Sequence, residues 1–187
     1  MNQTASLKNQ LLIAMPNLQD PNFARTVTYI CEHGDHGAMG IVLNRPTDLR
    51  LVDVLRHMQI EGGLGEAGEQ IVYLGGPVEE ERGFVLHTRT EPWGSTLAVN
   101  ADISITTSRD ILEAMARGDG PAQALVALGY AGWGAGQLER ELQENAWLSG
   151  PADQSILFEL PAEQRWEAAA RLLGIDVNLL SGEAGHA

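Results

Sequence analysis

The sequence predicts a single α+β domain in which an antiparallel-rich β-sheet is flanked by helices. Two observations favour this class. Runs rich in β-branched and aromatic residues come early and in hairpin-like pairs, whereas helical periodicity becomes frequent in the second half of the chain. The 187 residues correspond to one ordinary domain. We expect an ordered core over about residues 8–180, with residues 181–187 frayed.

Three strands are predicted at the start of the chain. Residues 11–15 form an apolar run that Pro16 ends. Residues 26–31 are β-branched and aromatic, and the turn residues at 33–37 connect them to a return strand at 38–43. These segments predict an N-terminal hairpin beside a third strand.

A short helix and two further strands are predicted next. Leucine, valine and methionine recur at helical spacing over residues 49–57, and Asp48 is the expected N-cap. A glycine-rich loop then leads to strands at 71–74 and 84–87, with an acidic turn at 79–81 between them.

The second half adds two strands at 97–99 and 103–106 and a helix at 109–117 that Ser108 caps and Gly118 ends. The remaining predicted elements are strands at 125–128 and 156–160 and helices at 137–147 and 162–173.

Charge and cysteine content bear on partners and compartment. There are 25 acidic residues against 12 basic ones, a formal net charge of −13, which disfavours nucleic acid and anionic membranes as partners. The lone Cys31 excludes an intramolecular disulfide. The N-terminus has no secretory pattern, and the apolar run at 11–15 is far shorter than a span of about 20 residues. We therefore expect a cytoplasmic protein without a membrane partner.

Several catalytic motifs are absent or misplaced. Residues 63–68 match a dinucleotide fingerprint as a string, but they follow a predicted helix and precede a strand, which is the wrong context. The chain has no phosphate-loop string and no GxSxG elbow. Cys31, His33 and His36 could hold a metal, but no second cluster supplies a fourth ligand, so we expect no metal and no cofactor.

Three glycine-bearing segments could form a binding site. Gly75 and Gly76 allow close approach of a ligand or simply a tight turn. Arg45 could bind an anion in bidentate fashion or pair with an internal acid. The arch at 129–136 carries Tyr130 and Trp133, which could wall a pocket or pack on the sheet.

Nine short segments occur along the chain in a characteristic order: 12–16, 20–23, 37–40, 44–46, 75–78, 82–87, 129–133, 136–139 and 145–148. Together they resemble the YqgE/AlgH family of bacterial proteins. The resemblance spans about residues 11–180. It implies a bifurcated, partly barrel-like β-structure flanked by helices, and it carries the label of a transcriptional regulator without an established catalytic activity, ligand or DNA site.

Three hypotheses for function follow. The first is a regulator, acting indirectly, that binds an unknown small molecule or protein partner in a cleft. The second is an enzyme of unknown class, with His87, Glu141 and Arg45 as acid, base and anion clamp. The third is a direct DNA-binding regulator, which the charge disfavours. The candidate binding residues are Asn44, Arg45, Gly75, Gly76, Pro77, His87, Tyr130, Trp133, Gln137 and Glu141.

Overall fold

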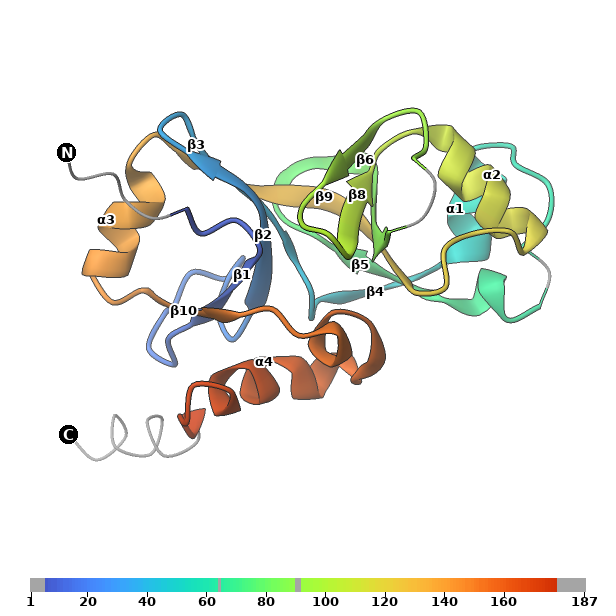
Figure 1. Ribbon diagram of the computed structural model, residues 1–187. Coiled ribbons are helices and arrows are strands. Elements are labelled where there is room, and N and C mark those ends of the chain that lie inside the picture. The colour runs from blue at the N-terminus through green and yellow to red at the C-terminus, as the bar shows by residue number, and fades with distance from the viewer. Residues whose placement is uncertain (1–5, 64, 90–91, 178–187) are drawn as a thin grey trace.

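A single long strand, β9 (Ala124–Gly134), joins two halves of one curled sheet (Figure 1). The computed structural model describes residues 6–63, 65–89 and 92–177, and the strands of this part form one ten-stranded sheet. The strand pairings in it are antiparallel except one, so the predicted α+β class with an antiparallel-rich sheet is confirmed.

The first half of the sheet attaches to the C-terminal end of β9. Its strands pair in antiparallel fashion, and their alternating residues are buried on both faces. Its order, ending at β9, is β10 (Trp147–Pro151), β1 (Gln10–Ala14), β2 (Val27–Gly34) and β3 (Gly37–Val42).

The second half attaches to the N-terminal end of β9. One edge of β9 carries an antiparallel ladder, and the other edge carries the one parallel pairing of the sheet. On the antiparallel side the order is β6 (Val78–Thr88), β8 (Ile103–Thr106) and β7 (Thr96–Ala98); on the parallel side it is β5 (Ile71–Leu74) and then β4 (Pro46–Arg50).

The sheet divides where β9 passes Gly129. β5 pairs with residues 126–128 of β9 and β3 pairs with residues 131–134, so these two strands diverge between the two ladders. Gly129 has φ +76°, and a β-carbon on Gly76 would lie 2.0 Å from the carbonyl carbon of Tyr130. Glycine at both positions lets the backbones cross at this close distance, which produces the bifurcation.

Helices cover the ends and one side of the sheet (Figure 1). Two of them pack at the end of the second half over a cluster built around Leu51, Leu55 and Ile111. A third covers the end of the first half, and the last runs along its side after a π-helical turn, Ser155–Glu159. The helices are α1 (Leu51–His57), α2 (Arg109–Arg117), α3 (Gln137–Gln143) and α4 (Ala162–Arg171), and Ala67–Glu69 forms a 3-10 turn.

The predicted strand at 156–160 is wrong, because these residues form the π-helical turn. The Asp153 carboxylate accepts hydrogen bonds from the main-chain N–H groups of Ser155 and Ile156, which begins a helical turn. A short apolar run is ambiguous between strand and buried helix, and here the capping side chain decides.

The predicted helix at 137–147 is too long. α3 ends at Gln143, and Asn145 takes a left-handed conformation with φ +62° that stops the helix. The chain then starts β10, an edge strand that the sequence pattern does not reveal.

Three local predictions are also wrong. Residues 79–81 are not a turn between strands but a bulge inside β6, with Val78 opposite Tyr130 and Gly83 opposite Leu128. Residues 46–50 form β4, and α1 therefore begins after Arg50 rather than Asp48. The arch at 129–136 is, up to Gly134, the continuation of β9. Among the described residues no helix is long and apolar enough to cross a membrane.

Candidate functional site

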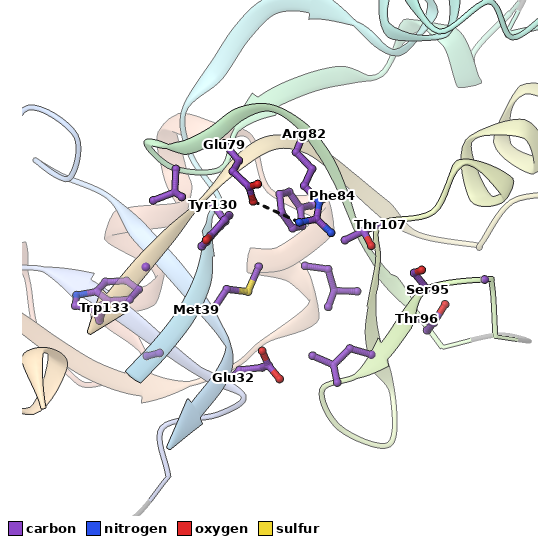
Figure 2. Close-up of a pocket in the computed structure, with 16 residues that line it drawn as sticks. Glu32, Met39, Glu79, Arg82, Phe84, Ser95, Thr96, Thr107, Tyr130 and Trp133 are labelled. Atoms are coloured by element: carbon purple, nitrogen blue, oxygen red, sulfur yellow. Dashed lines mark hydrogen bonds and ion pairs between the residues drawn. The ribbon is translucent and has the colours of Figure 1, made fainter. Parts of the chain in front are cut away.

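An open cleft of about 760 Å³ lies where the two halves of the sheet separate from β9. We call it the Tyr130 cleft. Residues from β2 and β3 form one wall, β9 lies at the back, and β6 with the segment around β7 and β8 forms the other wall (Figure 2). The lining residues are Glu32, Ala38, Met39, Val78, Glu79, Arg82, Phe84, Gly94, Ser95, Thr96, Leu97, Ile105, Thr107, Tyr130, Gly132 and Trp133.

The floor of the cleft is apolar and aromatic. Phe84 and Tyr130 meet edge to face, with ring centroids 5.6 Å apart and an interplanar angle of 66°. This is a favoured geometry for aromatic pairs and holds both rings in place. Met39 lies beside them in Figure 2, and its thioether adapts easily to a flat partner.

Charged side chains stand at the two ends of this floor (Figure 2). At one end Arg82 Nη1 donates to Glu79 Oε2 at 3.4 Å, and the Arg82 guanidinium lies 5.4 Å from the Phe84 ring centroid. At the other end lies the exposed carboxylate of Glu32, for which no ion pair is present among the described residues. The two carboxylates outnumber the single guanidinium, so the cleft favours positive charge.

Only one of the three glutamates on the bulge of β6 lines the Tyr130 cleft, although all three border a shallow surface hollow together with Arg82. Glu79 and Arg82 line the Tyr130 cleft, whereas Glu80 and Glu81 line a second cavity of about 840 Å³ beside α1 and α2. Glu79 itself has φ +49°, which is unusual for a residue with a side chain. Such strained positions concentrate at functional sites.

Of the predicted site residues, Tyr130 and Trp133 line the Tyr130 cleft. The Trp133 ring is nearly buried, and its indole N–H donates to Glu141 Oε1 at 3.0 Å. Gln137 donates from Nε2 to Glu141 Oε2 at 2.8 Å and accepts from the Gly134 N–H. Gln137 and Glu141 therefore support the back of the Trp133 ring rather than line the cleft.

Asn44 and Arg45 bind main-chain groups elsewhere. The Asn44 side chain accepts from Val27 N and donates to Arg25 O, and Arg45 Nη2 donates to Ala24 O at 2.7 Å. These hydrogen bonds connect the segment after β3 to the start of β2 and to the loop that precedes β2. Among the described residues Arg45 forms no ion pair with an acid.

Gly75 and Gly76 meet Tyr130 through the backbone. Gly75 N donates to Leu128 O and Gly75 O accepts from Val42 N, both at 2.8 Å. The expected glycine bends and the Tyr130 segment are therefore neighbours, but they form a junction of main chains and leave no cavity between them. Pro77 is exposed at the exit from this junction.

His87 is buried in the second half of the sheet, with only 1% of its surface exposed. Burial lowers its pKa, and the hydrogen bond between Nδ1 and Thr88 O opposes this. Its Nε2 lies 2.7 Å from Thr106 Oγ1, which is 2.8 Å from Thr96 Oγ1 in the wall of the cleft. His87, Glu141 and Arg45 thus lie in three separate environments and do not assemble the acid, base and clamp considered for an enzyme.

The side chains considered as metal ligands, Cys31, His33 and His36, also form no common site in the described structure. Cys31 is fully buried, and burial raises the pKa of its thiol well above the usual range. His33 Nδ1 accepts from Leu7 N, and His33 Nε2 lies 3.3 Å from Glu139 Oε1. The described residues contain no group of three histidine, cysteine or acidic side chains arranged to hold a metal ion.

Comparison with known proteins identifies the family of the chain. The AlgH-like family, DUF179, matches residues 11–178. The chain belongs to the AlgH-like family. Among its curated relatives are a UPF0301 protein of Thioalkalivibrio sulfidiphilus, 60% identical over the whole of both chains, and one of Nitrosococcus oceani, 57% identical over 96% of both.

Solved structures support the same assignment. The solution structure of the AlgH protein from Pseudomonas aeruginosa has a TM-score of 0.80 and 50% sequence identity over all of both chains. A crystal structure of a Corynebacterium diphtheriae protein, 20% identical, has a TM-score of 0.75 over 97% of this chain and 94% of that one, and shows the shared fold. The resemblance to the YqgE/AlgH family is confirmed.

In this AlgH-like chain, sequence reasoning missed most of the cleft. Glu32 and Met39 sit on the predicted hairpin, but nothing in its pattern shows that they face β6. Arg82 and Phe84 belong to one of the segments that carry the family resemblance, and this signal could have singled them out. Ser95 to Leu97 join the site only because the segment at β7 pairs with β8, which in turn pairs with β6.

Proposed function

We propose that this AlgH-like chain is a cytoplasmic binding protein whose Tyr130 cleft takes a ligand with a flat apolar body and a positively charged group. In this proposal any effect on transcription is indirect and passes through that ligand or a partner protein. The observation that carries it is the aromatic floor with the exposed carboxylate of Glu32 at one end and the Arg82–Glu79 pair at the other.

The dimensions and lining of the cleft support a small organic ligand. Binding pockets for such molecules span about 300–1,000 Å³ and combine apolar walls with a few polar groups. The cleft, at about 760 Å³, lies in this range. The paired rings of Phe84 and Tyr130 offer a surface for a flat body, and Glu32 offers an exposed carboxylate for a cation.

Direct contact with DNA has little support from the surface. α3 carries Glu139 and Glu141 against Arg140, and the whole chain has a formal net charge of −13. Phosphate contacts require clustered lysine or arginine. A gel-shift titration against salt checks this: specific binding that weakens steeply with ionic strength contradicts an indirect role.

Two probes with the same apolar body and opposite charge test the ligand class. Calorimetric titration with 2-naphthylmethylamine and with 2-naphthoate compares a cation with an anion on one flat ring system. We expect the amine to bind at least about tenfold more tightly than the acid, because the carboxylates at both ends attract it. Equal binding of both probes, or no binding of the amine, contradicts the proposal.

Variants locate that binding in the cleft. Tyr130→Ala and Glu32→Gln should each weaken amine binding about tenfold or more. The matched pair Glu79→Gln and Glu80→Gln is more selective, since neighbouring side chains on the same bulge line different cavities. Glu79→Gln should weaken the amine and Glu80→Gln should not. The same effect from both variants would place the amine elsewhere.

A further inference from the structure

Arg165 is a buried cation with no anionic partner in the part of the chain that the structure describes. It lies in the first turn of α4 with only 4% of its surface exposed. Among the described residues no carboxylate lies within the 4.0 Å of an ion pair from its guanidinium. Removing a charge from water is costly unless it is paired, and this chain has 25 acidic residues from which a partner could have come.

The partners that Arg165 does have are neutral and use part of the guanidinium. Nε donates to Leu160 O at 2.9 Å, and Nη1 donates to Leu43 O at 2.7 Å. The Tyr73 ring packs against the guanidinium, with its centroid 5.1 Å away. Within the described part of the chain, Nη2 has no carbonyl or carboxylate acceptor. Burial lowers the pKa of Arg165, and a side-chain hydrogen bond with the neutral Tyr73 hydroxyl opposes this, so its partners among the described residues supply no counter-charge.

A small cavity lies at this position. It has a volume of about 320 Å³ and is formed where the π-helical turn and α4 meet β5 and the start of β9. Arg165 and Tyr73 line it together with the amide side-chain residues Gln70 and Gln123, and Leu157 and Phe158 close its apolar side. Apart from the arginine, none of its lining residues is charged, so nothing in it repels an anion.

We propose that this cavity is a binding site for a small oxyanion, a carboxylate or a phosphate group, held by the Arg165 guanidinium that lines it. A planar guanidinium binds such groups through two parallel hydrogen bonds. The anion supplies the counter-charge that the described residues do not provide, and the amide groups of Gln70 and Gln123 donate to its remaining oxygens. This site is separate from the Tyr130 cleft and prefers the opposite charge.

Arg165 also contacts segments from both halves of the sheet. Its two main-chain bonds connect α4 to the end of β3 and to the π-helical turn, while Tyr73 belongs to β5 in the other half of the sheet. An anion bound here is therefore expected to tighten the contact between the two halves.

The test is a titration with inorganic phosphate and, separately, with malonate, at constant ionic strength balanced with sodium chloride. The side-chain Nε–H signal of Arg165 in two-dimensional NMR is the readout, assigned from its loss in Arg165→Lys. We expect a saturable shift with at least one probe, and the probe that shifts it at lower concentration distinguishes phosphate from carboxylate chemistry. No saturable shift with either probe overturns the proposal.

A cavity-filling variant separates anion binding from the structural role of Arg165. Ala122→Phe occupies the exposed rim of the cavity and leaves the hydrogen bonds of Arg165 in place. It should weaken the better probe about tenfold or more, whereas Ala101→Phe, at an exposed site that does not line this cavity, should not. Unchanged binding in Ala122→Phe overturns the proposal. Binding of 2-naphthylmethylamine should be the same in both variants, so failure here leaves the Tyr130 cleft untouched.

Discussion

Trp133 and Trp147 donate their indole N–H groups to the same oxygen of one carboxylate, Glu141 Oε1, at 3.0 Å and 2.9 Å. The two rings lie edge to face at 6.0 Å, and Phe23 packs against both. β9, α3 and β10 are thereby joined at one point behind the Tyr130 cleft. This carboxylate is a structural acceptor, although its sequence position suggested a binding residue.

Removing this acceptor should destabilise the fold. Glu141→Ala leaves two nearly buried indole N–H groups without a partner, and each costs about 1–3 kcal/mol. We expect the free energy of unfolding to fall by about 2–4 kcal/mol in urea denaturation followed by tryptophan fluorescence. Glu141→Gln should cost less, because its amide oxygen still accepts. The control Glu144→Ala, at an exposed site, should change stability by less than about 0.5 kcal/mol. Equal effects at 141 and 144 would contradict the structural role.

His87 should make stability depend on pH. Its pKa in the folded state is lowered by burial, so the unfolded chain binds a proton at higher pH than the folded chain does. Its contribution to stability is complete above the unfolded pKa of about 6.5 and is lost as pH falls below that value. Unfolding measured between pH 5 and 8 should show a smaller loss at acidic pH in His87→Gln than in the unmodified chain. His57→Gln, at an exposed position, should follow the unmodified chain. Parallel pH profiles for all three proteins would contradict this expectation.

Gly76 should tolerate no side chain. A β-carbon there would lie 2.0–2.3 Å from the main chain of Tyr130 and Ala131, and neither strand can move without breaking the junction. Gly76→Ala is expected to cost about 3 kcal/mol or more in a denaturant titration. Gly83→Ala is the matched control within the neighbouring β6, because a β-carbon there would have no atom within 4 Å. A midpoint for Gly76→Ala as high as that for Gly83→Ala would show that the junction is looser than the structure indicates.

Local sequence patterns predicted much of the fold. The hairpin of β2 and β3, the strand β5 and the helix α2, with Gly118 at its left-handed end, follow from periodicity and turn residues alone. The wrong predictions concern residues whose local pattern suits either a strand or a helical turn. Ile156 and Leu157 are apolar enough for a strand, but the Asp153 cap turns them into a helical turn.

The candidate site was predicted less well. Tyr130 and Trp133 were recognised from their place in a glycine-rich segment, whereas Arg165 was not considered. A sequence signal for it existed: Arg165 is one turn before Ala169 and beside Trp166, and so lies on the buried face of its helix. Arg45, the arginine that sequence reasoning favoured for anions, binds a main-chain carbonyl instead.

By itself the sequence determined the class of the fold, its family and its strongly negative charge, because these depend on composition, periodicity and the order of local motifs along the chain. Only the tertiary structure decided that Glu79 and Arg82 line the Tyr130 cleft while Glu80 and Glu81 do not, and that no carboxylate of the described residues pairs with the buried Arg165. Such features depend on the path of β9 and β6 past each other, where contacts between distant residues outweigh local preference. The side chains that meet at this crossing come from residues far apart in the sequence, so no local sequence pattern predicts that they meet.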